Sequence, residues 1–139
     1  MKALDTVNIS VVVDTKEGPR FPNLRDVNSL TLVEVSDRLK GALAGTSPSA
    51  PEIVGALRIS DFTPLGVSSV AEILETVSTS ALSISALSKV PKVQADGKVR
   101  FVSVATVTLS TDARVVDPEV AERFMTTLQK LLASPTTLL

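Results

Sequence analysis

The sequence predicts an α+β fold, in which a mixed β-sheet carries two main helices on one of its faces. β-rich runs typical of strands occupy several short segments, and two other segments have the three- and four-residue apolar spacing of amphipathic helices. Placing both helices on one side of the sheet is the simplest way to bury their apolar faces. The length of 139 residues fits a single domain over residues 1–139, which we expect to bury roughly two thirds of its unfolded-state surface.

The first two strands are predicted from apolar runs that end at proline and glycine. Residues 7–14 read VNISVVVD and are mostly apolar on both faces, which is typical of an interior strand. Gly18 and Pro22 follow and break this run. Residues 55–62 read GALRISDF and predict a second strand, which the Thr63-Pro64-Leu65-Gly66 turn closes.

The first helix is predicted between these strands. Its apolar residues recur at helical spacing and are Leu32, Val35, Leu39 and Leu43. Asn28 or Ser29 can cap its start, and Gly45 marks its end. Residues 46–51 contain two prolines and two serines and predict a loop.

The middle of the chain predicts a hairpin. Residues 67–77 are compatible either with a short helix or with an irregular crossing. Residues 81–87 and residues 99–110 then read as strands, and Asp96-Gly97 lies between them with the composition of a tight turn. We therefore expect these two strands to pair antiparallel.

The second helix has a clear beginning in Asp117-Pro118-Glu119. Asp is a favoured N-cap, proline is favoured in the first turn, and an acid near the N-terminus interacts well with the helix dipole. One apolar face follows at Val120, Phe124, Leu128 and Leu131. Ser134-Pro135 is predicted to end the helix.

The composition excludes several classes of function. The net charge is −1 and aromatic residues make up only 3%, which disfavours nucleic acid and anionic membranes as partners. The sequence has neither Cys nor His, so we expect no thiolate nucleophile, no metal site and no bound cofactor. No apolar run reaches the roughly 18 to 20 residues of a membrane span, and a strand pattern begins so early that the chain is expected to be a piece of a longer protein.

Several segments together resemble one family. The strand 7–14 is followed by a Gly, a Pro and Leu24-Arg25-Asp26; Leu57-Arg58-Ile59-Ser60 comes next, and then residues 109–117, which read LSTDARVVD. In order and spacing the chain resembles the C-terminal part of the catalytic domain of the dihydrolipoamide acyltransferases of 2-oxo acid dehydrogenase complexes. The resemblance covers nearly the whole chain, extends to Arg123-Phe124 and the 131–135 tail, and implies a truncated chloramphenicol acetyltransferase-like fold.

The chain departs from this family at the positions that are catalytic in the family. The family signature Asp-His-Arg-x-x-Asp-Gly falls on residues 112–118, so the resemblance places Ala113 where the general base should be and Pro118 where the glycine should be. A methyl group cannot accept a proton, and a positioned base is typically worth 10²–10⁴-fold in rate. The oxyanion serine of the family corresponds to Ser60, but the following Asn-Leu-Gly is replaced by residues 61–63, and the Asn-Pro-Pro turn is unmatched near residues 75–77.

The remaining signature residues favour structural roles. The resemblance implies that Asp112 and Arg114 hold the loop by an internal ion pair, which we expect to be buried and costly to break, by about 3 to 5 kcal/mol. For Asp117, the role of helix cap is favoured over a catalytic role. Ser60 is more often a strand serine than an oxyanion donor. The apolar tail residues Leu138 and Leu139 are interface candidates, because this tail makes contacts between trimers in the family.

The resemblance therefore implies a non-catalytic component of a pyruvate dehydrogenase complex in the mitochondrial matrix. Such a domain, similar to the fungal branch of the non-catalytic relatives, forms a homotrimer, docks in the dihydrolipoamide acetyltransferase core, and recruits dihydrolipoamide dehydrogenase through an upstream domain absent here. The alternative is an active acetyltransferase, whose base is Asp112 or comes from a neighbouring chain. A free coenzyme A binder is disfavoured, because no basic cluster is present for its phosphates.

Overall fold

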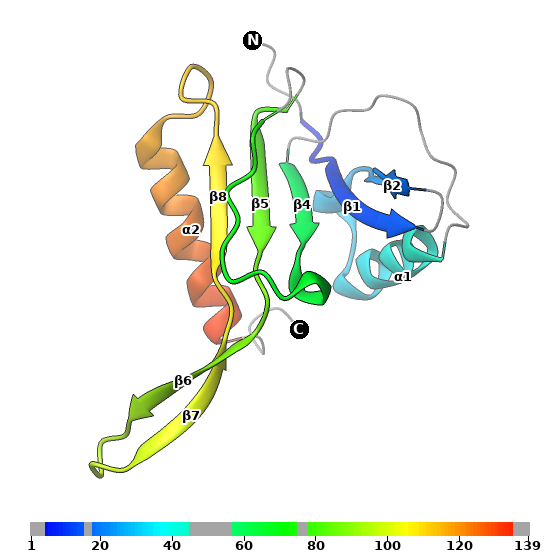
Figure 1. The fold of residues 1–139 in the computed structure, drawn as a ribbon. Helices are drawn as coiled ribbons and strands as arrows, with labels where there is room; N and C mark the ends of the chain where they lie inside the picture. Colours follow the sequence, from blue (N-terminus) through cyan, green and yellow to red (C-terminus); the bar gives the residue numbers. More distant parts are fainter. Residues whose placement is uncertain (1–4, 16–17, 45–56, 75–77, 135–139) are drawn as a thin grey trace.

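The computed structural model describes residues 5–15, 18–44, 57–74 and 78–134 (Figure 1). The strands are β1 (Ile9–Thr15), β2 (Gly18–Arg20), β3 (Asn23–Leu24), β4 (Leu57–Asp61), β5 (Ser80–Ile84), β6 (Ser88–Val93), β7 (Val99–Val104) and β8 (Val107–Thr111). The helices are α1 (Leu32–Leu43) and α2 (Pro118–Ala133), with 3₁₀ turns η1 (Val27–Ser29) and η2 (Thr63–Leu65). The loop predicted at 46–51, residues 75–77 where the family's Asn-Pro-Pro turn is unmatched, and the tail with Leu138 and Leu139 lie outside the described residues.

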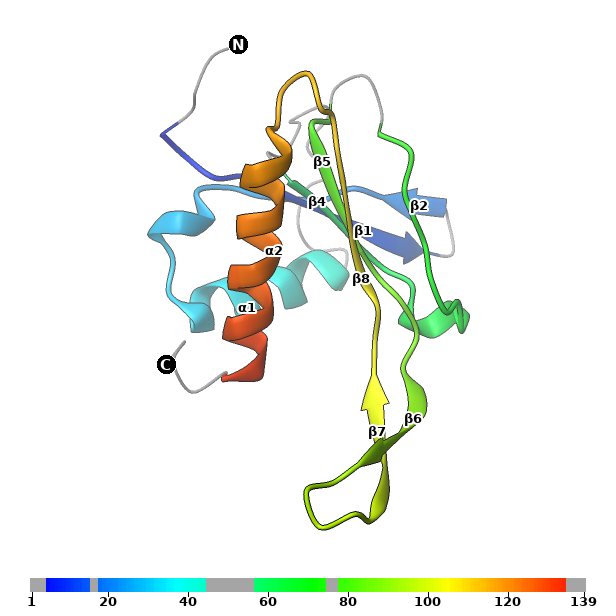
Figure 2. The ribbon, with the colours of Figure 1, turned by 90° about the vertical axis from the view of Figure 1, so that its left-hand side faces the viewer.

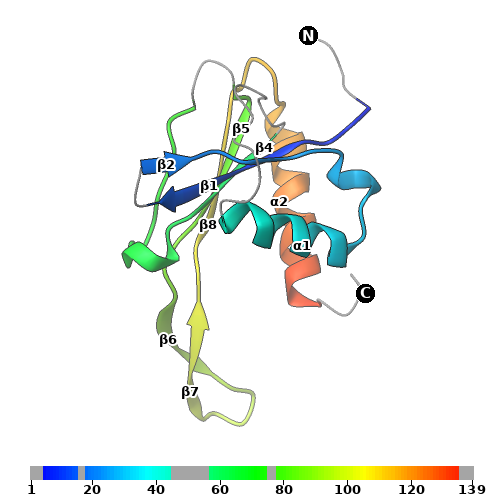
Figure 3. The ribbon, with the colours of Figure 1, turned by 90° about the vertical axis from the view of Figure 1, so that its right-hand side faces the viewer.

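The main sheet has the strand order β2-β1-β4-β5-β8, and β3 pairs with β1 beside β2. β1 and β4 are parallel, β4 and β5 are parallel, and β5 and β8 are antiparallel. The sheet is therefore mixed, with β1 in its interior as its apolar character predicts. Both helices lie on the same side of it (Figures 2 and 3), which confirms the predicted fold class.

The two faces of the sheet differ in chemistry. Alternate residues such as Leu57, Ile59 and Leu82 face α2, whereas Arg58 and the residues in register with it face the other way. This second face is covered by residues 67–74, which form neither helix nor strand in the structure. The irregular crossing is thus the correct one of the two interpretations of this segment.

The first helix begins later than the sequence predicted. Thr31 caps α1, and a capping box joins the Thr31 side chain to the Glu34 backbone and the Glu34 side chain to the Thr31 backbone. The expected caps are wrong: Ser29 ends η1, and the Asn28 side-chain oxygen accepts from the Val7 N–H at 2.9 Å. Asn28 instead ties the segment before α1 to the segment before β1.

The predicted hairpin turn is correct, but its strands are divided. Gly97 has φ 77, and the Lys98 N–H donates to the Asp96 side chain at 3.0 Å. On the two sides of this turn β6 and β7 pair with each other in a separate two-stranded sheet, while β5 and β8 pair within the main sheet. The hairpin therefore continues past the body of the molecule as a narrow ribbon (Figure 1).

Few apolar side chains are fully buried among the described residues. The buried apolar residues among the described ones are Leu24, Ala42, Ala81 and Leu82, so the core is small and aliphatic.

Candidate functional site

The signature loop connects β8 to α2 and is closed by Asp112. The Asp112 N–H donates to the Thr79 carbonyl at 3.0 Å, which keeps the loop in register with the residue before β5. The Asp112 carbonyl accepts from the Val115 and Val116 N–H groups at 2.9 and 2.8 Å. The chain therefore makes a tight turn over Ala113 and Arg114 and returns toward α2.

The side chains of Asp112 and Arg114 reinforce this turn. Arg114 Nη2 lies 2.7 Å from Asp112 Oδ2, and Arg114 Nε and the Arg114 backbone N–H each donate to Asp112 Oδ1 at 3.0 Å. These hydrogen bonds lower the pKa of Asp112 to about 2, and the carboxylate raises the pKa of Arg114. A carboxylate so strongly held in its charged form is a poor general base for a thiol.

The expectation that this pair is buried is wrong. The Arg114 side chain is 88% exposed and that of Asp112 is 22% exposed. Both residues belong to a tight turn at the end of the sheet, so the guanidinium lies in solvent even though its geometry is ideal. The pair fixes the shape of the loop, but its attraction is screened by water.

The turn ends in the helix cap. The Asp117 carboxylate accepts from the Glu119 N–H at 2.8 Å, and Pro118 occupies the first turn of α2. The helix then runs to Ala133 with Ser134 as its C-cap. Ala113 is exposed in the turn, and its methyl group supplies no acceptor.

Ser60 lies in β4 on the polar face of the sheet. It is 2% exposed, and its hydroxyl has no hydrogen-bond partner among the described residues. In register beside it is Ser83, which is 1% exposed and donates to Glu72 Oε1 at 2.8 Å. The next residue, Asp61, is exposed. Its carboxylate accepts a hydrogen bond from the Thr63 N–H at 2.9 Å, at the start of η2.

A buried ion pair adjoins Ser60, and sequence analysis missed it. Arg58 Nη2 lies 2.8 Å from Glu72 Oε2, and the two side chains are 10% and 11% exposed. Arg58 Nη2 also donates to the Ile73 carbonyl at 3.3 Å, so one guanidinium holds both the side chain and the backbone of the crossing segment. The sequence signal is an arginine between the apolar residues Leu57 and Ile59 of a strand, since such a charge needs a partner when buried.

One chain does not bring Ser60 and Ala113 together. Ser60 is in register with Ser83, and Ser83 is in register with Thr108. From Thr108 to the end of β8 at Thr111 the strand runs roughly 10 Å away from that row, and Ala113 lies beyond it. Chemistry that used both positions would therefore need residues of two copies.

The opposite face of the sheet holds an apolar groove beneath α2, with a volume of about 470 Å³. Its lining comes from β1, β4, β5, β8 and α2 and includes Ile59, Leu109 and Phe124, with Ser80 and Thr111 as the polar members. No titratable side chain lines it, so the groove offers apolar surface and no acid–base chemistry. Ala113 and Ser60 are both absent from its lining.

Two negative findings apply to the described residues. No group of three His, Cys, Asp or Glu side chains is placed so that it could hold a metal ion. None of the described helices has the length and hydropathy needed to cross a membrane.

Comparison with known proteins gives the family. The model of the 2-oxoacid dehydrogenases acyltransferase (catalytic domain) matches residues 1–139. The lipoamide acyltransferase component of the mitochondrial branched-chain alpha-keto acid dehydrogenase complex of Arabidopsis thaliana is 28% identical over 92% of this chain and 27% of its own length. The mitochondrial pyruvate dehydrogenase protein X component of Mus musculus is 30% identical over 96% of this chain and 28% of its own length.

A solved structure agrees with the fold. The dihydrolipoamide acetyltransferase of Azotobacter vinelandii, from a study of a serine, a histidine and an asparagine in its catalytic mechanism, superposes with a TM-score of 0.76 at 24% identity. The alignment covers 97% of this chain and 57% of that one. The chain thus spans about a quarter of the curated relatives named above and just over half of the solved domain. Because the family model matches the whole chain, the protein belongs to the 2-oxoacid dehydrogenases acyltransferase (catalytic domain) family.

Proposed function

We propose that residues 1–139 form a single non-catalytic assembly domain of the protein X type. It forms a homotrimer, docks in the dihydrolipoamide acetyltransferase core of a pyruvate dehydrogenase complex, and so recruits dihydrolipoamide dehydrogenase through another domain. The observation that carries the proposal is Ala113, which stands in a signature loop whose hydrogen bonds and helix cap are otherwise complete.

The spacing of the Azotobacter enzyme supports the assignment of Ala113 to the position of the base. In that enzyme the serine lies about fifty positions before the histidine and the asparagine four positions after it. Here Ser60 lies about as far before Ala113, and Asp117 lies four positions after it. Of the three, this chain keeps the serine, replaces the histidine by alanine, and uses the third position as a helix cap.

The groups that remain near the loop do not replace a base. The Asp112 carboxylate receives its hydrogen bonds from Arg114, and its pKa of about 2 lies far below that of a thiol. The Asp117 carboxylate accepts a hydrogen bond from the Glu119 N–H in the first turn of α2. The Ser60 hydroxyl is buried on the polar face of the sheet, two strands across from β8, where β-strand packing explains its presence without catalysis.

The proposed setting follows from the relatives. Protein X of Mus musculus and the Arabidopsis acyltransferase are both mitochondrial components of dehydrogenase complexes, while other relatives are bacterial. We place this chain with the mitochondrial ones, because a small residue at the position of the base on a retained scaffold resembles the pattern of protein X. The C-terminal Leu138 and Leu139 remain proposed contacts between trimers.

Light scattering and co-sedimentation with a purified dihydrolipoamide acetyltransferase core test the proposal. We expect the chain to run at about three times its mass of 14.6 kDa and to sediment with the core. A strict monomer that stays in the supernatant would contradict the assembly role.

The alternative function is an acetyltransferase whose base comes from a neighbouring copy or from Asp112. The placement of Ser60 and Ala113 far apart in one chain favours a site shared between copies, if the chain reacts at all. Transfer of acetyl groups to dihydrolipoamide above background by the assembled chain would establish this alternative.

A further inference from the structure

The Glu72 carboxylate is held on the polar face of the sheet in the way that a bound acid would be held. Its Oε2 atom lies 2.8 Å from Arg58 Nη2, and its Oε1 atom accepts a hydrogen bond from the Ser83 hydroxyl at 2.8 Å. Each carboxylate oxygen therefore has its own donor, and one of the two donors is a cation. The Arg58 and Glu72 side chains are only 10% and 11% exposed, so water competes little for these contacts.

Ser60 adds a third hydroxyl at the same place. Ser60 is in register with Ser83 on the neighbouring strand and lies two residues from Arg58 in β4, so all three side chains share the polar face. Neighbouring strands lie about 4.8 Å apart, which puts the Ser60 hydroxyl within reach of a small group bound to Ser83. Ser60 is 2% exposed, and its hydroxyl has no partner among the described residues. The Glu72 carboxylate thus leaves one buried polar group unused, although such groups are normally paired.

The crossing segment that carries Glu72, residues 67–74, is lightly held. It runs over the face of the sheet opposite the helices (Figures 2 and 3), and none of its residues is buried. Ile73, next to Glu72, is 90% exposed. Because little apolar surface fixes this segment, its attachment depends on polar contacts, and Glu72 makes two of those. An acid from solution that offers the same carboxylate can therefore compete with it.

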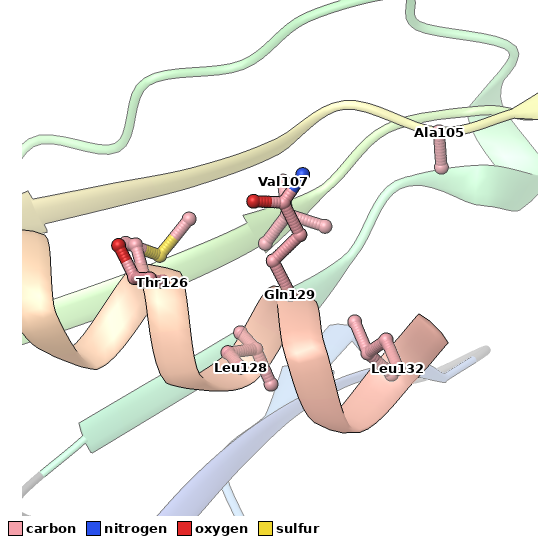
Figure 4. Close-up of a pocket in the computed structure, with 7 residues that line it drawn as sticks. Ala105, Val107, Thr126, Leu128, Gln129 and Leu132 are labelled. Atoms are coloured by element: carbon pink, nitrogen blue, oxygen red, sulfur yellow. The ribbon is translucent and has the colours of Figure 1, made fainter. Parts of the chain in front are cut away.

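The cavities on the other face of the sheet lack such chemistry. The hollow of about 360 Å³ between β8 and α2 is lined by Ala105, Val107 and residues of α2, among which Thr126 and Gln129 are polar and none is charged (Figure 4). The groove beneath α2 likewise has no titratable side chain in its lining. Of these three places, the one at Arg58 has the cation that an acid needs.

The three donors define the class of ligand. Arg58 and Ser83 bind a carboxylate, as they do with Glu72, and one negative charge is what one buried guanidinium needs. The unused Ser60 hydroxyl requires a further oxygen beside that carboxylate. Small acids that have a hydroxyl or keto oxygen on the carbon next to the carboxylate offer this arrangement.

We propose that Arg58, Ser60 and Ser83 form a binding site for a small 2-hydroxy or 2-oxo carboxylate, and that Glu72 occupies this site in the structure. The ligand carboxylate replaces that of Glu72 on Arg58 and Ser83, and the second oxygen of the ligand pairs with the Ser60 hydroxyl. Glu72 then leaves the sheet together with the crossing segment. The site goes beyond the proposed assembly role and does not depend on it.

Acetate and glycolate test the site, because they differ only in the hydroxyl on the second carbon. Acetate is also the fragment that Glu72→Ala removes. We expect both acids to bind the Glu72→Ala protein and raise its thermal midpoint, and glycolate to bind at least about 5-fold more tightly, since it pairs the Ser60 hydroxyl. If this variant is unfolded without ligand, the same acids should refold it, as followed by circular dichroism.

Three further variants serve as controls. Ser60→Ala in the Glu72→Ala background should leave acetate binding unchanged and abolish the preference for glycolate. Ser85→Ala in that background should keep the preference, because Ser85 is also 2% exposed but its hydroxyl already accepts from the Thr106 N–H at 2.7 Å. Arg58→Met/Glu72→Leu, which has neither charge, should bind neither acid.

The wild-type chain tests whether a ligand displaces Glu72. Lactate and pyruvate have the carbon skeleton of propionate and add a hydroxyl and a keto oxygen, respectively, so the tighter of the two identifies the ligand class. We expect that acid to bind the wild type at least about 10-fold more weakly than the Glu72→Ala protein, because Glu72 competes from within the chain. It should also increase the hydrogen exchange of residues 67–74.

Two results would overturn the proposal. One is binding of lactate, pyruvate and propionate with equal affinity whether or not Ser60 is present. The other is a Glu72→Ala protein that neither binds acetate or glycolate nor is refolded by them. Both results leave the assembly role untouched, because light scattering and co-sedimentation measure that role separately.

Discussion

Two Arg–carboxylate pairs of similar geometry hold two loops of this protein, and they differ in their surroundings. Arg58 and Glu72 are 2.8 Å apart and about nine tenths buried, and they fasten the crossing segment to the polar face of the sheet. Arg114 and Asp112 are 2.7 Å apart, with the guanidinium in solvent, and they shape the signature loop. Local hydrogen bonds therefore keep the shape of the loop that carries the family signature, while the buried pair fastens the crossing segment and would leave an uncompensated charge if one partner were lost.

The two ion pairs differ in how their two residues are brought together. Asp112 and Arg114 are two residues apart and meet within one tight turn, so backbone hydrogen bonds already bring them together. Arg58 and Glu72 come from a strand and a segment without regular structure, and their contact is what connects the two. Breaking the first pair relaxes a turn, whereas breaking the second leaves a charge inside the protein.

The largest expected effect is that of Glu72→Ala. It leaves the Arg58 guanidinium buried without its carboxylate, and the free energy of unfolding should fall by about 3–5 kcal/mol in a urea titration. The double variant Arg58→Met/Glu72→Leu serves as the control, because it removes both charges and should recover most of this loss. A Glu72→Ala protein as stable as the wild type would show that the buried pair does not fasten the crossing segment.

A smaller effect separates two neighbouring serines. Ser83→Ala removes the hydrogen bond to Glu72 and should lower the unfolding free energy by about 1–3 kcal/mol. Ser60→Ala removes a buried hydroxyl that has no partner among the described residues, so it should be neutral or slightly stabilising. Equal losses in thermal denaturation of the two variants would mean that Ser60 has a stabilising contact.

The helix cap that ends the signature loop comes next. Asp117→Ala removes the acceptor for the Glu119 N–H at the start of α2 and should cost about 1 kcal/mol of unfolding free energy. Asp117→Ser, which can still cap, should retain most of the wild-type stability in the same measurement. Loss with both variants would indicate that the carboxylate does more than cap the helix.

The smallest effect on stability is expected for Arg114→Ala, because the pair is exposed. The variant should instead change a titration. The pKa of Asp112 should move from about 2 toward its ordinary value of 3.8, as measured by NMR of the carboxyl carbon. Because the pKa is depressed in the folded state, the contribution of Asp112 to stability is present above pH 4 and is lost as pH falls through about 2. An unchanged midpoint in the variant would assign the low pKa to another group.

Local features of the fold were predictable, and long-range contacts were not. Asp117-Pro118-Glu119 and Asp96-Gly97 specify a helix start and a turn within a few residues, and both are found as predicted. The true cap of α1 also had a local signal, since Thr31 and Glu34 have the spacing of a capping box. Asn28 and Ser29 are equally good caps by residue type, so residue type alone does not select Thr31.

The Arg58–Glu72 pair illustrates the other case. Its two residues are far apart in the sequence, and Glu72 lies in a segment whose pattern fits no regular element. The burial of the Asp112–Arg114 pair was wrongly expected for a related reason, because residue types do not reveal whether a turn faces the body or the solvent. Position in the tertiary structure, rather than chemistry of the residue, decides which pair is buried.

The central claim is that this protein keeps the signature loop but has given up its chemistry, and acetyl transfer from acetyl-coenzyme A to dihydrolipoamide tests it most directly. The assay compares the assembled wild-type chain with its Ser60→Ala and Asp112→Asn variants. We predict that all three give the background rate. Turnover by the wild type well above background, lost in either variant, would contradict the claim and make Ser60 or Asp112 a working catalytic group.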